Sequence, residues 1–297
     1  MFHTGGVTWL PENKLPLFIE CNFKQFRLFN PEVNVYFLTD KQHLSNEVFK
    51  KYNILPFDKD QFYSNKIREF ESLFNIYDKN DFWTVTATRL IYIENFMADM
   101  NLTNVYHFEN DVLIYYNLAA HDKTFRSLYN DMAITVGGEI VAMTGFMFIK
   151  HSGALADMTK YFIDMLRRFG IQGTCDRYRI PMVNEMFLMR QYGIDFPGQL
   201  RNLPTMPFGE YSENVEAFNS LFDPASYGQF VGGTQSEGPG AMPQDHYIGR
   251  WLKKNPQIYI YWNDEGLNLP YLVFDKKVIK INNLHIHSKN LHKYMSV

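Results

Sequence analysis

Hydrophobic residues in the first part of the chain recur at two spacings, one typical of amphipathic helices and one typical of buried strands. Residues 15–29 carry apolar side chains at helical intervals, and this pattern ends at Asn30-Pro31, where proline disfavours a longer helix. Residues 33–39 (Val-Asn-Val-Tyr-Phe-Leu-Thr) are mostly β-branched or aromatic, which predicts a buried strand that ends at Asp40.

The same alternation continues towards the C-terminus. The pattern predicts helices over 82–100, 153–169 and 181–192 and strands over 104–108, 133–136, 141–149 and 278–287. Helices that alternate with strands indicate an α/β fold with a mostly parallel central sheet and helices on both faces. Ligands of such sheets bind at the carboxyl ends of strands, where Asp40 and the triplet Glu109-Asn110-Asp111 fall.

Residues 195–245 have a different composition, rich in Gly, Pro, Ser and Asn. A segment of this length is too long for a plain connection, which favours a functional loop. With no internal repeat in the 297 residues, we expect a single domain over 1–297 with a loop-rich C-terminal part.

Composition and charge exclude several classes of protein. Hydrophobic residues make up 46% of the chain and charged residues 21%, which is typical of a globular protein. The net charge of −3 does not favour binding along a nucleic-acid backbone. Two cysteines, no visible signal sequence and no apolar run of about 18 residues indicate a cytoplasmic protein with no integral membrane segment.

The segment around Glu109-Asn110-Asp111 is the first candidate site. Two carboxylates two residues apart follow directly on an apolar strand and precede the apolar residues 112–116. Hard divalent cations such as Mn²⁺ or Mg²⁺ prefer oxygen ligands and keep positions open for substrate phosphates. The alternative is an exposed acidic turn, but a surface turn does not need a buried strand leading into it.

The second candidate lies near the C-terminus, in Asn282-Asn283-Leu284-His285-Ile286-His287-Ser288-Lys289. Alternation along a strand places His285 and His287 on the same face, where a neutral imidazole is a common metal ligand. Lys289 is suited to contact phosphate as a point charge. The alternative is a surface strand with two incidental histidines.

Together these segments resemble those of GT-A fold glycosyltransferases. Phe-Glu-Asn-Asp-Val-Leu-Ile-Tyr (108–115) looks like the Asp-x-Asp segment of that fold, and His285 to Lys289 is similar to the C-terminal His and Lys of its glycogenin-like and galactosyltransferase-like members. The helix and strand over 16–40 resemble the opening of the fold. Met143 to Ile149, which includes Gly145, resembles the strand that lines the donor and acceptor sugars.

The resemblance implies a GT-A type (Rossmann-like) glycosyltransferase, a hexosyl- or pentosyltransferase that uses a UDP- or GDP-sugar donor, UDP favoured, with Mn²⁺ or Mg²⁺. A glycan or protein hydroxyl would be the acceptor, either soluble or met at a membrane surface. Residues 1–118 would then form the nucleotide-binding half and 119–297 the acceptor half.

In this scheme Asp111, Glu109 and one of the two histidines hold the metal. Arg89 and Lys289 offset phosphate charge, and Asp40 contacts the base or ribose, with Asn110 and Gly145 also on the donor side. The chain departs from the family at Glu109, which replaces an Asp and leaves Asp111 as the more direct ligand. It also lacks the family's C-terminal glycines, so the choice between His285 and His287 stays open, with a slight preference for His285.

The catalytic carboxylate is assigned from position alone. Glu185 opens a predicted helix after a loop and is a candidate general base, although a first-turn Glu also interacts favourably with the helix dipole. Asp223 is the second candidate, and Asp223-Pro224 is also compatible with a simple turn. Asp245 is a third candidate.

Two other functions are compatible with these residues. A non-catalytic nucleotide- or carbohydrate-binding protein would use the same site without turnover. A sugar nucleotidyltransferase fits less well, because it normally carries a Gly-rich, basic phosphate-binding signature near the N-terminus, and Gly5-Gly6 with Lys14 is a poor match.

Overall fold

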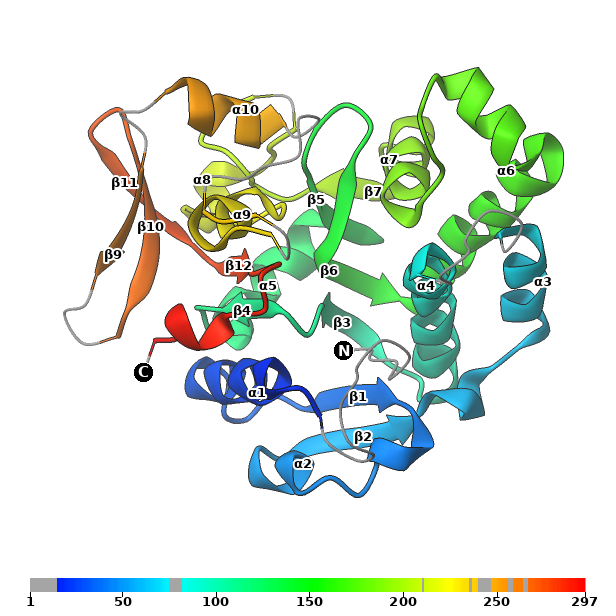
Figure 1. Ribbon diagram of the computed structural model, residues 1–297, viewed down its shortest axis with the longest axis horizontal. Coiled ribbons are helices and arrows are strands. Elements are labelled where there is room, and N and C mark those ends of the chain that lie inside the picture. Colours follow the sequence, from blue (N-terminus) through cyan, green and yellow to red (C-terminus); the bar gives the residue numbers. More distant parts are fainter. Residues whose placement is uncertain are drawn as a thin grey trace.

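The computed structural model describes residues 15–74, 82–209, 211–234, 237–239, 247–255, 259–263 and 267–296. It is a mixed α/β structure in which several small sheets are surrounded by helices (Figure 1). Of the candidates named above, Asp245 lies outside the described residues. None of the described helices is long and apolar enough to cross a membrane.

The helices and strands have the following bounds. The helices are α1 (Leu17–Phe29), α2 (Glu47–Lys51), α3 (Asn65–Phe74), α4 (Phe82–Asp99), α5 (Leu118–Leu128), α6 (Ser152–Tyr178), α7 (Glu185–Asp195), α8 (Val215–Phe218), α9 (Ser226–Gly232) and α10 (Tyr247–Lys254). The strands are β1 (Val35–Thr39), β2 (Ile54–Asp58), β3 (Thr103–Phe108), β4 (Val112–Ile114), β5 (Met132–Val136), β6 (Ala142–His151), β7 (Leu200–Asn202), β8 (Ser220–Leu221), β9 (Tyr259–Asn263), β10 (Leu269–Phe274), β11 (Lys277–Ile281) and β12 (Asn283–His285).

The central sheet has the order β3-β6-β5-β7, and it is mixed rather than mostly parallel. Strand β6 pairs antiparallel with both β3 and β5, and only the β5–β7 pair is parallel. The expectation of one mostly parallel sheet is therefore wrong. The reason is local: β5 and β6 are joined by the short turn at Gly137-Gly138, and a connection this short permits only an antiparallel pair.

A separate parallel pair, β1–β2, lies beside this sheet without joining it (Figure 1). Between β1 and β3 lies a mainly apolar cavity of about 360 Å³, lined by residues of both strands together with α4 and α1. Within the described residues, the edges of β1 and β3 that face this cavity have no strand partner. The cavity thus separates two sheets that the sequence pattern predicts as one.

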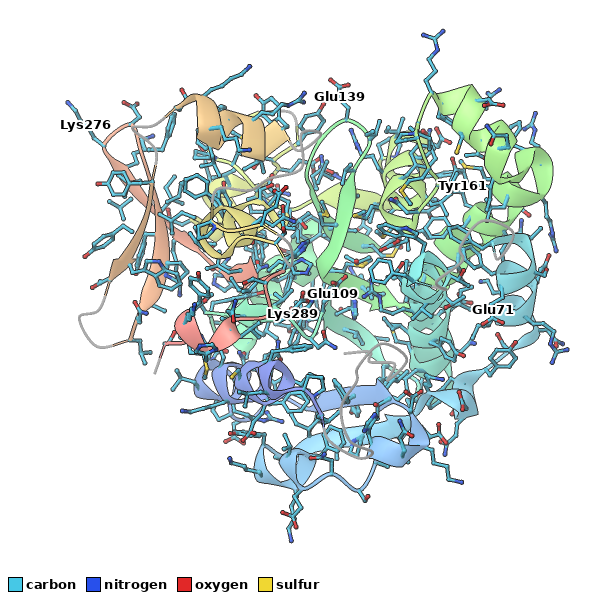
Figure 2. All side chains as sticks on the ribbon, in the orientation of Figure 1. Glu71, Glu109, Glu139, Tyr161, Lys276 and Lys289 are labelled. Atoms are coloured by element: carbon cyan, nitrogen blue, oxygen red, sulfur yellow. The ribbon has the colours of Figure 1, made fainter. Side chains whose placement is uncertain are left out.

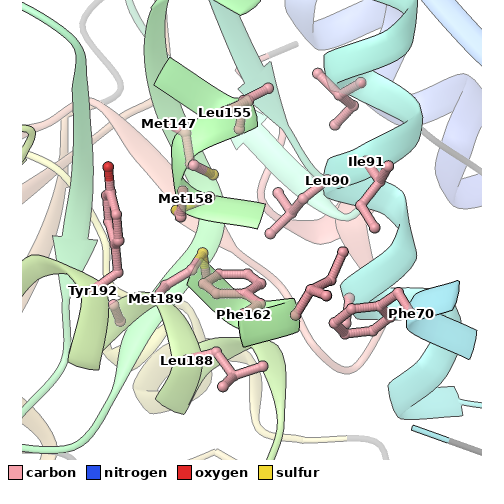
Figure 3. Packing of buried hydrophobic residues seen from close by; sticks show 14 of the residues in the cluster. Phe70, Leu90, Ile91, Met147, Leu155, Met158, Phe162, Leu188, Met189 and Tyr192 are labelled. Atoms are coloured by element: carbon pink, nitrogen blue, oxygen red, sulfur yellow. The ribbon is translucent and has the colours of Figure 1, made fainter. Parts of the chain in front are cut away.

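Helices cover both faces of the central sheet, as expected. Along β6, Met147 and Ile149 pack on one side against α4, α6 and α7, and Figure 3 shows this core with Leu90, Phe162 and Leu188. The neighbouring residues Phe146 and Phe148 face the other side, where α1 and α5 contribute aromatic residues. A strand buried on both faces has no polar alternation, which explains the mostly apolar and fully buried run over 142–149.

The C-terminal part forms two further small sheets. In one, β12 pairs antiparallel with β4, the strand that follows the acidic triplet. In the other, the order is β8-β11-β10-β9, and a third hydrophobic cluster lies beneath it. The strand expected over 278–287 is therefore divided at Asn282 between β11 and β12, and the loop expected over 195–245 contains the short elements β7, α8, β8 and α9.

Candidate functional site

The acidic triplet forms the turn between β3 and β4, and β12 holds the C-terminal histidine next to it. His285 is the register partner of Val112, the residue that follows Asp111. A backbone hydrogen bond of 2.9 Å from Ile286 N–H to the carbonyl of Asp111 continues this pairing into the turn. Helix α1 also holds strand β4 in place, because Asn22 Nδ2 donates a hydrogen bond of 2.6 Å to the carbonyl of Val112.

Three side chains converge at this turn. Nε2 of His285 lies 3.1 Å from Oδ1 of Asp111 and 3.3 Å from Oε2 of Glu109. Ligand atoms of these three residues all lie within 4.8 Å of one another. We call Glu109, Asp111 and His285 the acidic–histidine cluster. Two carboxylates and one imidazole at this separation are a donor set that suits a divalent cation such as Mn²⁺.

Cations balance the cluster on two sides. Lys289 Nζ contacts Oδ2 of Asp111, and Figure 2 shows Lys289 and Glu109 close together at the centre of the molecule. Arg89, on α4, lies 2.9 Å from Oε1 of Glu109 and donates to Oγ1 of Thr144 at 2.8 Å. Thr144 in turn donates to the same Glu109 oxygen. Oε1 of Glu109 is thus held by Arg89 and Thr144, while Oε2 faces His285.

The charges shift the proton affinities of the cluster. Burial raises the pKa of Asp111 and of Glu109, but the neighbouring cations outweigh burial and hold both pKa values below their usual range. Burial lowers the pKa of His285, but the negative charges of Asp111 and Glu109 outweigh it and raise that pKa to about 10. The two carboxylates are therefore ionised near neutral pH, as metal ligands must be, whereas His285 is protonated there and would release its proton when a cation binds.

Glycines make room for His285. A Cβ atom at Gly145 would lie 2.7 Å from Nδ1 of His285, so the imidazole rests directly on the backbone of β6. A Cβ atom at Gly228 would lie 2.1 Å from the carbonyl oxygen of His285, so α9 packs against β12 without a side chain between them. The structure thus places Gly145 against the ring of His285 and Gly228 against its backbone.

His287 lies beside the cluster with a different partner. Its ring centroid is 4.1 Å from that of His285, in keeping with the expectation that the two share a face. Nδ1 of His287, however, lies 2.8 Å from Nε2 of Gln229. Burial and the charge of His285 lower the pKa of His287 to about 3. The group of residues whose ligand atoms converge includes His285 and not His287.

Asp223 is completely buried beneath β12. Its Oδ1 accepts the backbone N–H of Tyr227, and its Oδ2 accepts those of Gly228 and His285, all at 2.8–2.9 Å. Burial raises the pKa of Asp223 to about 6, although these hydrogen bonds oppose the shift. The carboxylate therefore ties the start of α9 to the strand that carries His285.

Glu185 is also buried, 4% exposed, at the first position of α7. Its Oε2 accepts a hydrogen bond of 2.9 Å from Oγ1 of Thr86, and its Oε1 lies 4.0 Å from Arg89. Burial raises the pKa of Glu185 to about 7, with Arg89 acting in the opposite direction. Through Arg89, Glu185 is connected to Glu109.

The remaining candidates lie around this centre. Asn110 occupies the middle of the acidic turn and is half-buried. Asp40 follows β1, where its Oδ1 lies 3.1 Å from Nζ of Lys59. Thr86 and Thr144 were not singled out from the sequence, although both lie in segments that were, because a threonine on a helix or strand carries no pattern that reveals its hydrogen-bond partner.

Comparisons with known proteins do not assign a family. No protein-family model matches this chain, and no curated protein sequence matches it significantly. Among solved structures, mouse xyloside xylosyltransferase 1 in its apo form is similar over 63% of this chain and 79% of its own, with 9% identity and a TM-score of 0.47. A cytidylyltransferase from Leptospira borgpetersenii serovar Hardjo-bovis is similar over 86% of this chain and 93% of its own, with 12% identity and a TM-score of 0.40. At these TM-scores the likeness carries no functional argument, and the function rests on the site.

Proposed function

We propose that this protein is a divalent-metal-dependent glycosyltransferase that moves a sugar from a nucleotide-diphosphate donor, a UDP- or GDP-sugar, to a hydroxyl group of a glycan or protein. The observation that carries the proposal is the acidic–histidine cluster, whose ligand atoms lie within 4.8 Å of one another beside Lys289. A buried cluster of this kind at the end of a strand is suited to hold a cation and a diphosphate together.

The donor set fits Mn²⁺ or Mg²⁺. Carboxylate oxygens suit both ions, and the imidazole of His285 favours Mn²⁺ over Mg²⁺. When bound, such an ion neutralises the charge that develops on the diphosphate as the sugar leaves. We assign Asp111 and His285 as ligands, with Glu109 completing the set through its Oε2.

The protein's own residues then orient the donor and accept the proton. Lys289, which contacts Asp111 in this structure, would be placed to bind the diphosphate when a cation occupies the site. Arg89 and Thr144 keep Glu109 in one orientation. Asp40, Asn110 and Gly145 contribute on the donor side, and we propose 1–118 as the nucleotide-binding half and 119–297 as the acceptor half.

Glu185 is assigned as the general base that takes the proton of the acceptor hydroxyl. A carboxyl group with a pKa of about 7 is matched to proton transfer near neutral pH. We assign Asp223 as a residue that positions His285, and not as the catalytic residue considered from the sequence. The reason is that its two oxygens already accept hydrogen bonds from three backbone N–H groups.

The experiment that tests the proposal is a thermal shift with UDP, GDP, CDP and dTDP, each with and without Mn²⁺, followed by an assay for nucleotide release from the matching sugar donor. Stabilisation by one nucleotide only when metal is present, with release of that nucleotide, is the expected result. Metal-dependent binding without release, in the presence of an acceptor panel, would instead identify a non-catalytic binding protein. Pyrophosphate release from a nucleoside triphosphate and a sugar phosphate would identify a nucleotidyltransferase, and no shift with any nucleotide would contradict the site itself.

A further inference from the structure

Within the described part of the chain, the sheet formed by β9, β10 and β11 packs one face on the protein and carries exposed side chains on the other. Ile260, Trp262, Leu272, Ile279 and Ile281 belong to the hydrophobic cluster beneath the sheet. The strand register places two rows of residues on the opposite face. One row is Tyr259, Val273 and Val278, and the other is Tyr261, Tyr271 and Lys280. We call these six residues the outer face of the sheet.

The outer face exposes large apolar groups. Tyr259 is 53% exposed, Tyr261 45% and Val278 60%, and the rings of Tyr261 and Tyr271 lie 6.4 Å apart. The sheet stands at one end of the molecule, away from α3 and α6 (Figure 1). Apolar groups gathered on one surface, unlike a single exposed side chain, indicate an interaction site.

Positive charge accompanies these groups. Lys276 lies with Asp275 in the exposed turn between β10 and β11, and Figure 2 shows Lys276 pointing outwards at the edge of the molecule. Lys277, the first residue of β11, is also exposed, but the register places it on the opposite face from Val278. Lys280 lies in the row of Tyr261 and Tyr271. Residues 247–297 carry eight Lys and Arg against three Asp and Glu, in a chain whose net charge is −3. Lys276, Lys277 and Lys280 outnumber Asp275 on this sheet, which favours an anionic partner.

We propose that the outer face docks on the surface of an anionic lipid bilayer. Tyrosine, with its apolar ring and polar hydroxyl, is enriched at membrane–water interfaces, and lysine stems extend along apolar surface while the ammonium reaches the headgroups. A second copy of the chain is disfavoured, because lysine is depleted in protein–protein interfaces and both copies would contribute Lys276 and Lys280. A nucleic acid is disfavoured because an exposed aliphatic residue such as Val278 gains nothing from stacked bases, and the face carries no arginine.

Docking at this face would also orient the candidate site. Strand β11 leads through Asn282 directly into β12, which ends at His285. The two sheets are thus joined by a single residue. Docking would therefore hold the acidic–histidine cluster at a fixed distance and orientation from the bilayer surface. The inference does not depend on which reaction the cluster performs.

The experiment is co-sedimentation of the full chain with vesicles of phosphatidylcholine alone and of phosphatidylcholine with about 30% phosphatidylglycerol, at low and high salt. We expect binding to the anionic vesicles only, weakened by salt. The double variant Lys276→Ser/Lys277→Ser should lose about fivefold in affinity per lysine, and Tyr259→Ser/Tyr261→Ser should also weaken binding. Circular dichroism checks that each variant is folded.

The matched control is Lys41→Ser/Lys50→Ser, which removes the same charge from two exposed positions near α2. This variant should bind as the unaltered protein does. Equal losses in the control and in Lys276→Ser/Lys277→Ser would overturn the proposal, because binding would then reflect total charge. Failure to bind anionic vesicles would also overturn it, as would binding to RNA or self-association through this face without binding to vesicles.

Discussion

His285 and Asp111 lie far apart in the sequence, yet Nε2 of His285 lies 3.1 Å from Oδ1 of Asp111. The contact depends on the antiparallel pairing of β4 with β12, which sets His285 opposite Val112. The local sequence makes each residue a candidate ligand but does not show that the two meet. Their convergence, with Glu109 at 3.3 Å from the same imidazole nitrogen, makes the turn after β3 a candidate metal centre.

Replacing Asp111 by Asn should abolish transfer while leaving the fold intact. The carbonyl of residue 111 still accepts the N–H of Ile286, so the turn keeps its backbone pairing. Loss of the carboxylate should lower Mn²⁺ affinity by at least about 100-fold, measured by titration calorimetry. Asp157→Asn, at an exposed position on α6, is the matched control and should leave both affinity and activity unchanged. Full activity of Asp111→Asn in added Mn²⁺ would contradict the metal role.

Gly145→Ala should disturb the site through His285 alone. The added methyl group would lie 2.7 Å from Nδ1 of the imidazole, which must then move away from Asp111 and Glu109. We expect a loss of about 10- to 100-fold in Mn²⁺ affinity and a loss of about 1–3 kcal/mol in the free energy of unfolding. Gly137→Ala is the control, because its Cβ would meet its neighbours at 3.5 Å or more. Equal metal affinity in the two variants would argue against His285 as a ligand.

Much of the fold could be predicted from periodicity, and the exceptions have physical reasons. Helices α1 and α4 and strands β1, β3 and β6 are confirmed near their predicted bounds, because each carries enough buried apolar residues to mark it in the sequence. The helix predicted to end at residue 169 continues as α6 to Tyr178, but Gly170, with φ of 64°, interrupts it at that point. The elements between residues 195 and 245 were missed because they are short and depend on distant contacts, such as the hydrogen bond from Tyr227 Oη to the carbonyl of Thr205.

The candidate site could be predicted in part. The acidic triplet was found because it follows a strand, and the C-terminal histidines because they alternate along one. The proximity of Glu109, Asp111 and His285 agrees with the expectation that these segments form one site. The choice between His285 and His287 could not be made from alternation, since both share a face. It depends on Gln229, which approaches Nδ1 of His287 from α9 at 2.8 Å. The assignment of these residues to metal, donor and acceptor stays a prediction.

Asp223→Asn separates a positioning role from a catalytic one. An amide has a single acceptor oxygen and would turn its NH₂ group towards backbone N–H groups, leaving at least one of the three buried donors unpaired. We expect a loss of about 3 kcal/mol in the free energy of unfolding, measured in urea, together with weaker Mn²⁺ binding. If Asp223 were instead the general base, activity would disappear while stability and metal affinity stayed near those of the unaltered protein.

Glu185→Gln should remove a pH dependence of stability that the unaltered protein shows between about pH 4.5 and 7. Burial raises the pKa of Glu185 from 4.5 to about 7 in the folded protein. In this window the folded state keeps a proton that the unfolded chain has released, so the contribution of Glu185 to stability falls as pH rises. Below the window both states are protonated, and above it both are ionised, so the change levels off.

The difference in unfolding free energy between Glu185→Gln and the unaltered protein isolates this contribution. As pH rises from 4.5 to above 7, the unfolding free energy of the variant should increase relative to that of the unaltered protein. The increase should be up to about 3 kcal/mol in total, or about 1.4 kcal/mol per pH unit. Urea unfolding at intervals of half a pH unit measures it, with Glu139→Gln, an exposed position between β5 and β6, as the matched control. A difference that does not change with pH would show that Glu185 ionises in the folded protein as it does in the unfolded chain. Glu185 could not then serve as a base with a pKa near neutrality, and the proton of the acceptor hydroxyl would have to go elsewhere.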